Sequence, residues 1–186
     1  MRDHQDLKSL QDACERGERP SLLLFWGHTE PADRGVTKAC LSQWYPATFT
    51  LAGETFPTAE HYMMFRKALL FGDDVAAASC LRASTPKQVK AIGRTVRNFD
   101  EPAWNAVRSE IVVAANTAKF EQNAALRTFL IETGEQILVE ASPTDAVWGI
   151  GLAADDPRAQ DPRAWQGLNL LGFALMRVRA ALAPSE

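Results

Sequence analysis

The chain has 186 residues, which is the length of one domain or of two very small ones. Apolar residues make up 46% of the sequence and charged residues 23%, as in folded globular proteins and unlike disordered chains. The formal net charge is −3, so the sequence lacks the basic excess typical of proteins that bind nucleic acid without sequence preference. This balance still permits a local basic site for one phosphate group.

The sequence shows no segment typical of membrane insertion or secretion. Its longest apolar runs, Leu22–Trp26 and Ile111–Ala115, are far shorter than the roughly 20 residues that span a bilayer. Acidic residues interrupt the N-terminal stretch Met1–Asp6, which therefore does not resemble a signal peptide. The three cysteines are far apart and form no C-x-x-C pair, which argues against a disulfide framework or a zinc knuckle. We expect a reduced, cytoplasmic protein that does not bind membranes.

The first third of the chain predicts one helix and three short strands. Asp6–Arg16 is typical of a short polar helix, which we expect at the periphery, and Leu22–Phe25 of a buried strand. Gly27–Ala39 carries no periodicity and predicts a loop. Phe49–Leu51 and Glu54–Phe56 flank an alanine-glycine pair, which predicts a hairpin with a two-residue turn.

The rest of the chain predicts mainly helices. The first of them begins at Pro57 and ends before Gly72, and the next begins at a capping box in which Thr85 caps and Pro86 occupies the first helical position. The later helices are expected from just after Asp100 to Phe120, at Asn123–Thr133 and at Leu168–Leu182, with a strand at Gln136–Ala141 and a loop over 142–167. This order lacks the alternation of a parallel βαβ sheet and predicts a predominantly helical α+β fold with a few short strands.

Glu60 and Lys67 are the first candidates for catalysis. They are seven residues apart in the helix that begins at Pro57, so they lie on one face, about 10.5 Å apart along the axis. A carboxylate and an amine that project into one cleft can move protons or react at a carbonyl-like carbon. The alternative is a capped helix with an acidic first turn and a solvated lysine.

Three further places carry residue types suited to a binding site. Trp104 and Arg108 are one helical turn apart, so the ring can stack on a heterocycle while the guanidinium holds a phosphate; a buried core tryptophan is the alternative. Asp145 and Trp148 lie in a glycine-containing loop after a strand, where aspartate also forms turns. Asn169 precedes the last helix, where capping is the simpler explanation. The three histidines have no spacing that suggests a shared metal, and we expect none.

The order of several short segments resembles the NADAR family of YbiA-like proteins. The most specific are T-A-E-H at 58–61 and D-x-x-W-G-x-G at 145–151. The resemblance covers about Leu22–Leu182, which predicts one NADAR domain over residues 21–186 after an N-terminal extension over residues 1–20. The segments are Gln43–Pro46, Phe49–Leu51, Pro57–Tyr62, Lys67, Gly93–Arg94, Trp104, Lys119–Asn123, Leu126, Thr133–Gly134, Glu140–Ser142, Asp145–Gly151, Gly167–Gly172 and Leu175–Arg179.

The resemblance implies an N-glycosidase that splits a ribose–nitrogen bond. Family members act on phosphoribosylamino-pyrimidine intermediates of riboflavin synthesis or remove ADP-ribose from guanine bases. The expected substrate is therefore a small ribosylated, phosphate-bearing base or ADP-ribosylated guanine, with ADP-ribosylated nucleic acid as a further partner. We assign catalysis to Glu60, Lys67 and Asp145, and substrate binding to Trp104, Arg108, Trp148, Gly149 and Asn169.

Two chemical routes fit these residue types, and neither requires a metal or a redox cofactor. A carboxylate can stabilise positive charge at C1 of the ribose or activate water. Alternatively, the Lys67 amine can form a Schiff base with the ring-opened sugar. That route requires a pKa lowered by burial or by a neighbouring cation, for which Arg66 and Arg108 are candidates. A non-catalytic module that binds ADP-ribose or NAD, and a helical interaction domain, are the alternatives to an enzyme.

Overall fold

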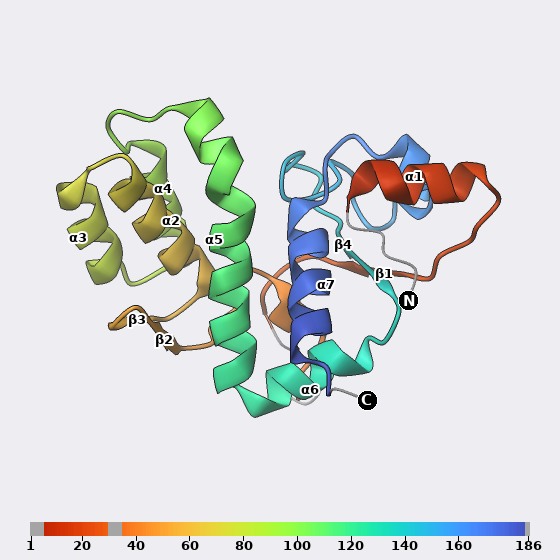
Figure 1. Ribbon diagram of the computed structural model, residues 1–186, viewed down its shortest axis with the longest axis horizontal. Coiled ribbons are helices and arrows are strands. Elements are labelled where there is room, and N and C mark those ends of the chain that lie inside the picture. The colour runs from red at the N-terminus through yellow and green to blue at the C-terminus, as the bar shows by residue number, and fades with distance from the viewer. Residues whose placement is uncertain (1–5, 30–34, 185–186) are drawn as a thin grey trace. The chain divides into compact units, whose positions relative to one another are not determined.

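The computed structural model describes residues 6–29 and 35–184 (Figure 1). Residues 1–5 of the predicted N-terminal stretch and residues 30–34 of the predicted loop lie outside this description. The described part of the chain contains seven α-helices and four short strands, which confirms the predominantly helical α+β fold class. The chain forms two compact units: unit 1 is Met1–Ser42 with Ala125–Glu186, and unit 2 is Gln43–Ala124.

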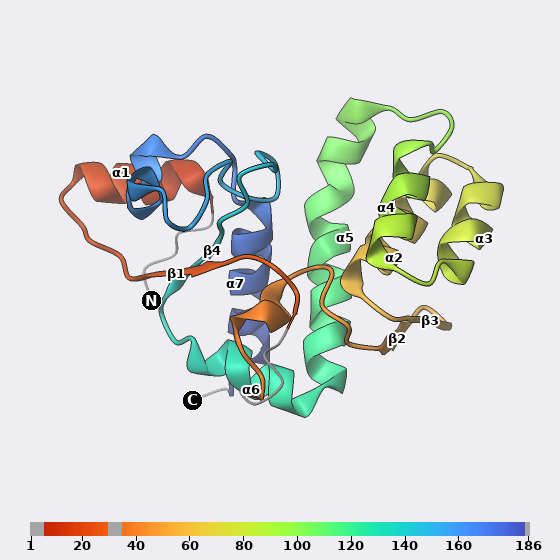
Figure 2. The same cartoon turned by 180° about the vertical axis from the view of Figure 1, so that it is seen from behind.

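Unit 2 is a bundle of four helices with a β-hairpin. Strands β2 (Phe49–Leu51) and β3 (Glu54–Phe56) pair antiparallel, as predicted. Both turn residues between them have positive φ, as a type I′ turn requires. Helix α2 packs against the other three helices of the unit, and both views show α3, α4 and α5 around it (Figure 2). The four helices are α2 (Ala59–Leu70), α3 (Asp74–Arg82), α4 (Pro86–Arg94) and α5 (Glu101–Gln122).

Helix α3 is the element of unit 2 that the sequence did not predict. Its buried residues, Ala77 and Cys80, are small, so its apolar stripe is weak in the sequence. The helix follows α2 after a short turn at Gly72, whose φ of +66° suits glycine. Asp73 then caps α3 by accepting a hydrogen bond from the Ala76 N–H at 3.1 Å.

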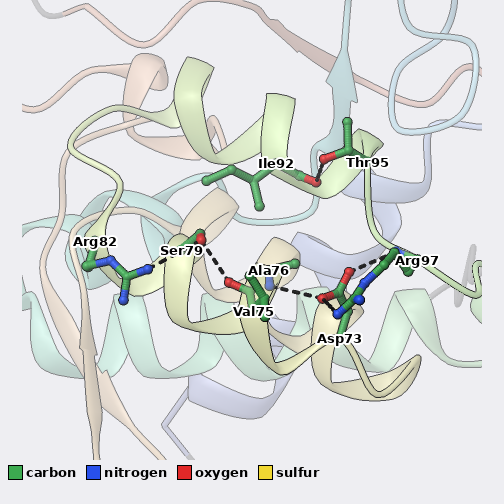
Figure 3. Close-up of polar contacts among 8 residues, drawn as sticks. All are labelled: Asp73, Val75, Ala76, Ser79, Arg82, Ile92, Thr95 and Arg97. Atoms are coloured by element: carbon green, nitrogen blue, oxygen red, sulfur yellow. Dashed lines mark hydrogen bonds and ion pairs between the residues drawn. The ribbon is translucent and has the colours of Figure 1, made fainter.

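Asp73 also fixes the segment that connects α4 to α5 (Figure 3). Its buried carboxylate accepts hydrogen bonds from the Arg97 backbone N–H at 2.9 Å and from the Arg97 guanidinium at 2.8 Å. The bonds from Arg97 and from the Ala76 N–H hold the pKa of Asp73 well below its usual range. One carboxylate thereby ties the start of α3 to the chain just before α5.

Unit 1 is built around two parallel strands. Strand β1 (Leu22–Phe25) pairs with β4 (Ile137–Glu140) in parallel register, and α7 (Leu170–Leu182) packs against β4. The unit also contains α1 (Leu7–Glu15), α6 (Ala124–Glu132) and three short 3₁₀ helices, at Lys38–Leu41, Pro157–Gln160 and Pro162–Ala164. Strands β1 and β4 and helices α6 and α7 lie close to their predicted positions.

Helix α1 is not peripheral as expected. Its Leu10 side chain is fully buried in an apolar cluster with Ile137, Val139 and Phe173. The polar surface of the helix, which suggested a peripheral position, is therefore only one of its two faces. The predicted boundary at residue 20 stays a prediction.

Replacing the Asp73 carboxylate should change both the stability of the protein and its response to acid. Because the pKa of Asp73 is lowered in the folded state, its contribution is present above the unfolded pKa of about 3.9 and is lost as the pH falls below that value. Asp73→Asn should therefore lower the melting temperature at neutral pH and have a smaller effect at about pH 3. Asp74→Asn, an exposed neighbour, is the control. An equal loss of stability by Asp73→Asn at both pH values would contradict this assignment.

Candidate active site

Glu60 lies in the first turn of α2, where the local sequence fixes its backbone. Thr58 caps the helix, and the Glu60 N–H donates to the Gln43 carbonyl at 3.0 Å. The Glu60 side chain is only 3% exposed. The sequence predicted this capped start, but an acidic first turn is usually solvated, so the burial of Glu60 distinguishes it from an ordinary helix-stabilising acid.

Lys67 lies two turns further along α2, with its amine held among a carbonyl and two aromatic rings. Nζ donates to the Gly93 carbonyl at 2.8 Å and lies 4.1 Å from the Phe99 ring centroid and 5.8 Å from that of Trp104. Burial lowers the pKa of Lys67 below its ordinary value, because desolvation penalises the charged form. Lys67 is therefore not the fully solvated lysine of the alternative interpretation, and the shift comes from burial rather than from a neighbouring cation.

Gly93 allows α4 to approach α2 closely enough for the contact with Lys67. A Cβ atom at this position would overlap the Met64 side chain. Gly93 lies in the last turn of α4, where carbonyl groups have no partner inside the helix and carry the negative end of its dipole. Such a carbonyl is a suitable acceptor for the Lys67 amine.

Trp104 is a core residue that also contacts the Lys67 amine, and its stacking on a substrate stays a prediction. Its side chain is 8% exposed and belongs to the core, yet its ring also faces the Lys67 amine. Arg108 follows one turn later on α5 and is half-buried. The structure therefore brings Lys67 and Trp104 together.

Asp145 acts as a turn-forming residue in unit 1. Its Oδ1 accepts hydrogen bonds from the backbone N–H groups of Val147 at 2.9 Å and Trp148 at 2.8 Å. The Gly149 backbone lies close to two carbonyls, those of Glu140 and Asp145, and a Cβ atom there would be only 2.7 Å and 2.9 Å from their oxygens. Asp145 and Gly149 thus both determine the backbone conformation of this loop.

Asn169 joins the loop to strand β4 of unit 1. Its Oδ1 accepts from the Glu140 N–H at 3.0 Å, and its Nδ2 donates to the Leu138 carbonyl at 2.9 Å. The residue adopts a left-handed conformation and does not cap α7 through its side chain. Instead, the first N–H groups of α7, at Leu170 and Leu171, donate to the carbonyls of residues 147 and 148.

The proposed site residues are therefore divided between the two units. Glu60, Lys67, Trp104 and Arg108 lie in unit 2, and Asp145, Trp148, Gly149 and Asn169 lie in unit 1. Sequence reasoning missed Phe99 and the Gly93 carbonyl as neighbours of the Lys67 amine. Phe99 precedes the N-cap of α5, where an apolar residue commonly packs on the helix, so its position carries no functional signal.

The described residues contain no group of three or more histidine, cysteine, aspartate or glutamate side chains that could hold a metal ion. His61 in particular uses both ring nitrogens within the protein: Nδ1 lies 2.8 Å from the Thr58 hydroxyl, and Nε2 lies 3.2 Å from the Ala83 carbonyl. Among the helices of residues 6–29 and 35–184, none is long and apolar enough to cross a membrane.

Comparison with known proteins identifies relatives of the chain. Residues 24–183 match the NADAR domain. The chain is 44% identical over 143 residues to N-glycosidase R617 of Acanthamoeba polyphaga mimivirus, which covers 74% of this chain and 84% of that protein. It is 40% identical over 129 residues to Protein irg-1 of Caenorhabditis elegans, covering 68% of this chain and 61% of that protein.

A solved structure shares the fold. The NMR structure of the Escherichia coli protein YbiA matches with a TM-score of 0.68 at 28% identity, covering 89% of this chain and 86% of that chain. The E. coli (strain K12) protein, named N-glycosidase YbiA, is 34% identical over 131 residues, covering 70% of this chain and 73% of that protein.

Removing the Asn169 side chain should destabilise the protein, because this side chain makes two hydrogen bonds to the backbone of β4. Asn169→Ala should lower the free energy of unfolding by about 1–3 kcal/mol, because it leaves a strand N–H and carbonyl without partners. Asn98→Ala is a matched control, since Asn98 is exposed and has a similar positive φ. Urea unfolding of both variants separates the hydrogen bonds from the backbone conformation. Equal losses in the two variants would show that the two bonds contribute nothing.

Proposed function

The chain belongs to the NADAR family, and we propose that it is an N-glycosidase that hydrolyses the bond between C1 of a ribose and an amine nitrogen of a base. The substrate is a ribosylated, phosphate-bearing base: a ribosylamino-pyrimidine phosphate or ADP-ribosylated guanine, the latter free or in nucleic acid. Relatives that are 32–44% identical and named N-glycosidases support the reaction class. The net charge of −3 favours a small metabolite over a polymer.

The placement of the Lys67 amine against the Gly93 carbonyl and the Phe99 and Trp104 rings is the observation that carries the proposal, and the partial burial that results lowers the pKa of the amine. A solvated lysine is almost wholly protonated at neutral pH, whereas a desolvated amine has a larger neutral fraction and can act as a nucleophile. The rings of Phe99 and Trp104 exclude water from one part of its surroundings and still tolerate the charged form through their π faces. A non-catalytic binding module has no need of such an amine.

In the Lys67 route, the ribose ring opens so that C1 forms an imine with the base nitrogen. The Lys67 amine adds to C1, the bond from C1 to the base nitrogen breaks, and the base leaves as an amine after taking up a proton. Water then hydrolyses the lysine imine, which returns the free amine and gives the sugar aldehyde. The overall reaction is the hydrolysis of one ribose–nitrogen bond, which consumes one water for each base released.

Glu60 is the proton-transfer group of either route. In the Lys67 route it takes the proton from the attacking amine or water and returns it to the departing nitrogen. In the direct route it activates the water that adds to C1 while the ribose–nitrogen bond breaks. Its position two turns before Lys67 on the same helix supports both assignments. Asp145, Trp148, Gly149, Asn169 and Arg108 remain proposed site residues on the family resemblance.

The reaction class is tested by mass spectrometry of products from three substrates: a ribosylamino-pyrimidine phosphate, ADP-ribosylated guanosine and ADP-ribosylated DNA. Release of the free amino-pyrimidine and ribose phosphate from the first substrate, or of ADP-ribose with unmodified guanosine or DNA from one of the other two, supports the proposal and identifies its substrate class. Binding of ADP-ribose by calorimetry with no product from any substrate would instead support a non-catalytic module.

Removing the charge of Glu60 should abolish turnover without unfolding the protein. Glu60→Gln keeps the size of the side chain but removes its ability to accept a proton, so kcat should fall by about 10²–10⁴. Circular dichroism and the melting temperature check folding, and Glu54→Gln, an exposed site on β3, is the control. Activity within about tenfold of the wild type would remove Glu60 from the catalytic role.

Lys67 should form a covalent adduct with the sugar during turnover. Borohydride should trap this adduct on Lys67, detected by peptide mass spectrometry, and Lys67→Arg should be inactive because a guanidinium does not form the imine. Because burial lowers the Lys67 pKa, the rate should rise with pH to a midpoint below the reference value of about 10.4.

The matched control for this experiment is Lys87→Arg, at an exposed lysine on α4. This variant should keep both the adduct on Lys67 and the activity. If no adduct forms and Lys67→Arg retains most of its activity, Lys67 is only a phosphate or hydroxyl contact, and the direct water route stands alone.

A further inference from the structure

Two side-chain amides meet in the interior of unit 2. Gln43 is 6% exposed and Asn116, on α5, is fully buried. The Asn116 Nδ2 donates to Gln43 Oε1 at 2.7 Å and to the Val112 carbonyl at 2.9 Å. The other two polar atoms of the pair, Gln43 Nε2 and Asn116 Oδ1, are buried and have no hydrogen-bond partner among the described residues.

The orientation of both amides follows from these contacts. Exchanging the oxygen and nitrogen of Asn116 would place its oxygen against the Val112 carbonyl and Gln43 Oε1, which repel it. The hydrogen bond between Asn116 Nδ2 and Gln43 Oε1 therefore leaves one unused donor group, Gln43 Nε2, and one unused acceptor, Asn116 Oδ1. Buried polar groups without partners destabilise a folded protein, so these two atoms require a partner, either an internal water or an atom of a bound ligand.

The surroundings of the pair connect it to the proposed catalytic helix. The Gln43 carbonyl accepts from the Glu60 N–H at 3.0 Å, so the residue that presents the free donor also fixes the backbone at Glu60. Gln43 is followed by Trp44 and Tyr45, which are both half-buried, and the buried Lys119 amine lies 5.6 Å from the Tyr45 ring centroid. Lys119 is one turn after Asn116 on α5, so the Tyr45 ring contacts the same part of that helix.

We propose that Gln43 and Asn116 recognise the base of the substrate through a lactam edge. Gln43 Nε2 donates to the carbonyl oxygen of the base, and Asn116 Oδ1 accepts from the adjacent ring N–H. This inference rests on the proposed function, whose two substrate classes, the pyrimidinones and guanine, both carry such an edge. A base edge with two acceptors or two donors leaves one of the two amide atoms unsatisfied and is rejected.

The first test changes the substrate and leaves the protein intact. A substrate methylated on the lactam nitrogen has no N–H for Asn116 Oδ1, and the methyl group fills the place of that hydrogen bond. The wild type should process it with a kcat/KM at least about tenfold lower than that of the parent compound. Equal values of kcat/KM for the two compounds would overturn the proposal.

The second test replaces both amides by apolar side chains of similar size, in Gln43→Met with Asn116→Leu. The melting temperature should stay equal or rise, because two unsatisfied buried groups are removed. KM should rise about tenfold to a hundredfold, and the discrimination against the methylated substrate should disappear. A lower melting temperature with unchanged KM would show that the pair is structural and is satisfied by an internal water.

Gln122→Met is the matched control, because this amide on α5 has both groups bonded to the backbone of Thr50 at 2.8 Å. It should lower the melting temperature and leave KM unchanged.

If the wild type converts no substrate, the proposed function fails, and calorimetry with guanosine monophosphate and its N1-methyl analogue tests base recognition by itself. Stronger binding of the unmethylated compound supports the proposal; equal binding overturns it. If the double variant does not fold, the comparison of methylated and parent compounds on the wild type decides.

Discussion

The partial burial of the Lys67 amine is the constraint on which the arrangement of the residues around it in unit 2 depends. Removing an ammonium group from water is costly, and here a helix-terminal carbonyl and two aromatic faces offset that cost. Each of these partners requires a further feature of the sequence. The carbonyl requires the close approach of α4 at Gly93, and Phe99 is held in place by the bonds of Asp73 to Arg97 and by edge-to-face contact with Phe71.

In unit 1, the motif residues Asp145 and Asn169 bond to the backbone, whereas Lys67 in unit 2 contacts aromatic rings as well as a carbonyl. The polar atoms of Asp145 and Asn169 that the structure accounts for are bonded to the backbone, and the glycines of the same motifs allow loop and helix to pack closely. A Cβ atom at Gly167 would overlap the Gly149 carbonyl, and one at Gly172 would overlap that of Leu138. The residues of the D-x-x-W-G-x-G pattern at 145–151 and of the G-x-N-x-L-G pattern at 167–172 thus have a structural role: they fix the backbone of the loop against β4 and α7. Any catalytic role of Asp145 is additional to it.

Sequence patterns predicted the elements whose signals are local. The hairpin at 49–56 and the helix begun by Thr58 follow from turn and capping residues, and both were found at their expected positions. The alanine-rich helix α3 was missed because its buried side chains are small, and α1 was misplaced because its polar face hides the buried Leu10. The neighbours of Lys67 and the pairing of Gln43 with Asn116 join residues 26 to 73 positions apart, which no local pattern specifies.

The proposed role of Lys67 depends on the protonation state of its amine, and a titration of that amine tests this role most directly. Lysine labelled with ¹³C at Cε, assigned through Lys67→Arg, reports by NMR the pH at which each amine loses its proton. We expect the Lys67 midpoint to lie below the reference value of about 10.4, and to move toward that value when Phe99→Ala admits water to the amine. A Lys67 midpoint at or above the reference value in the wild type would show that the amine is not desolvated and would contradict its role as the nucleophile.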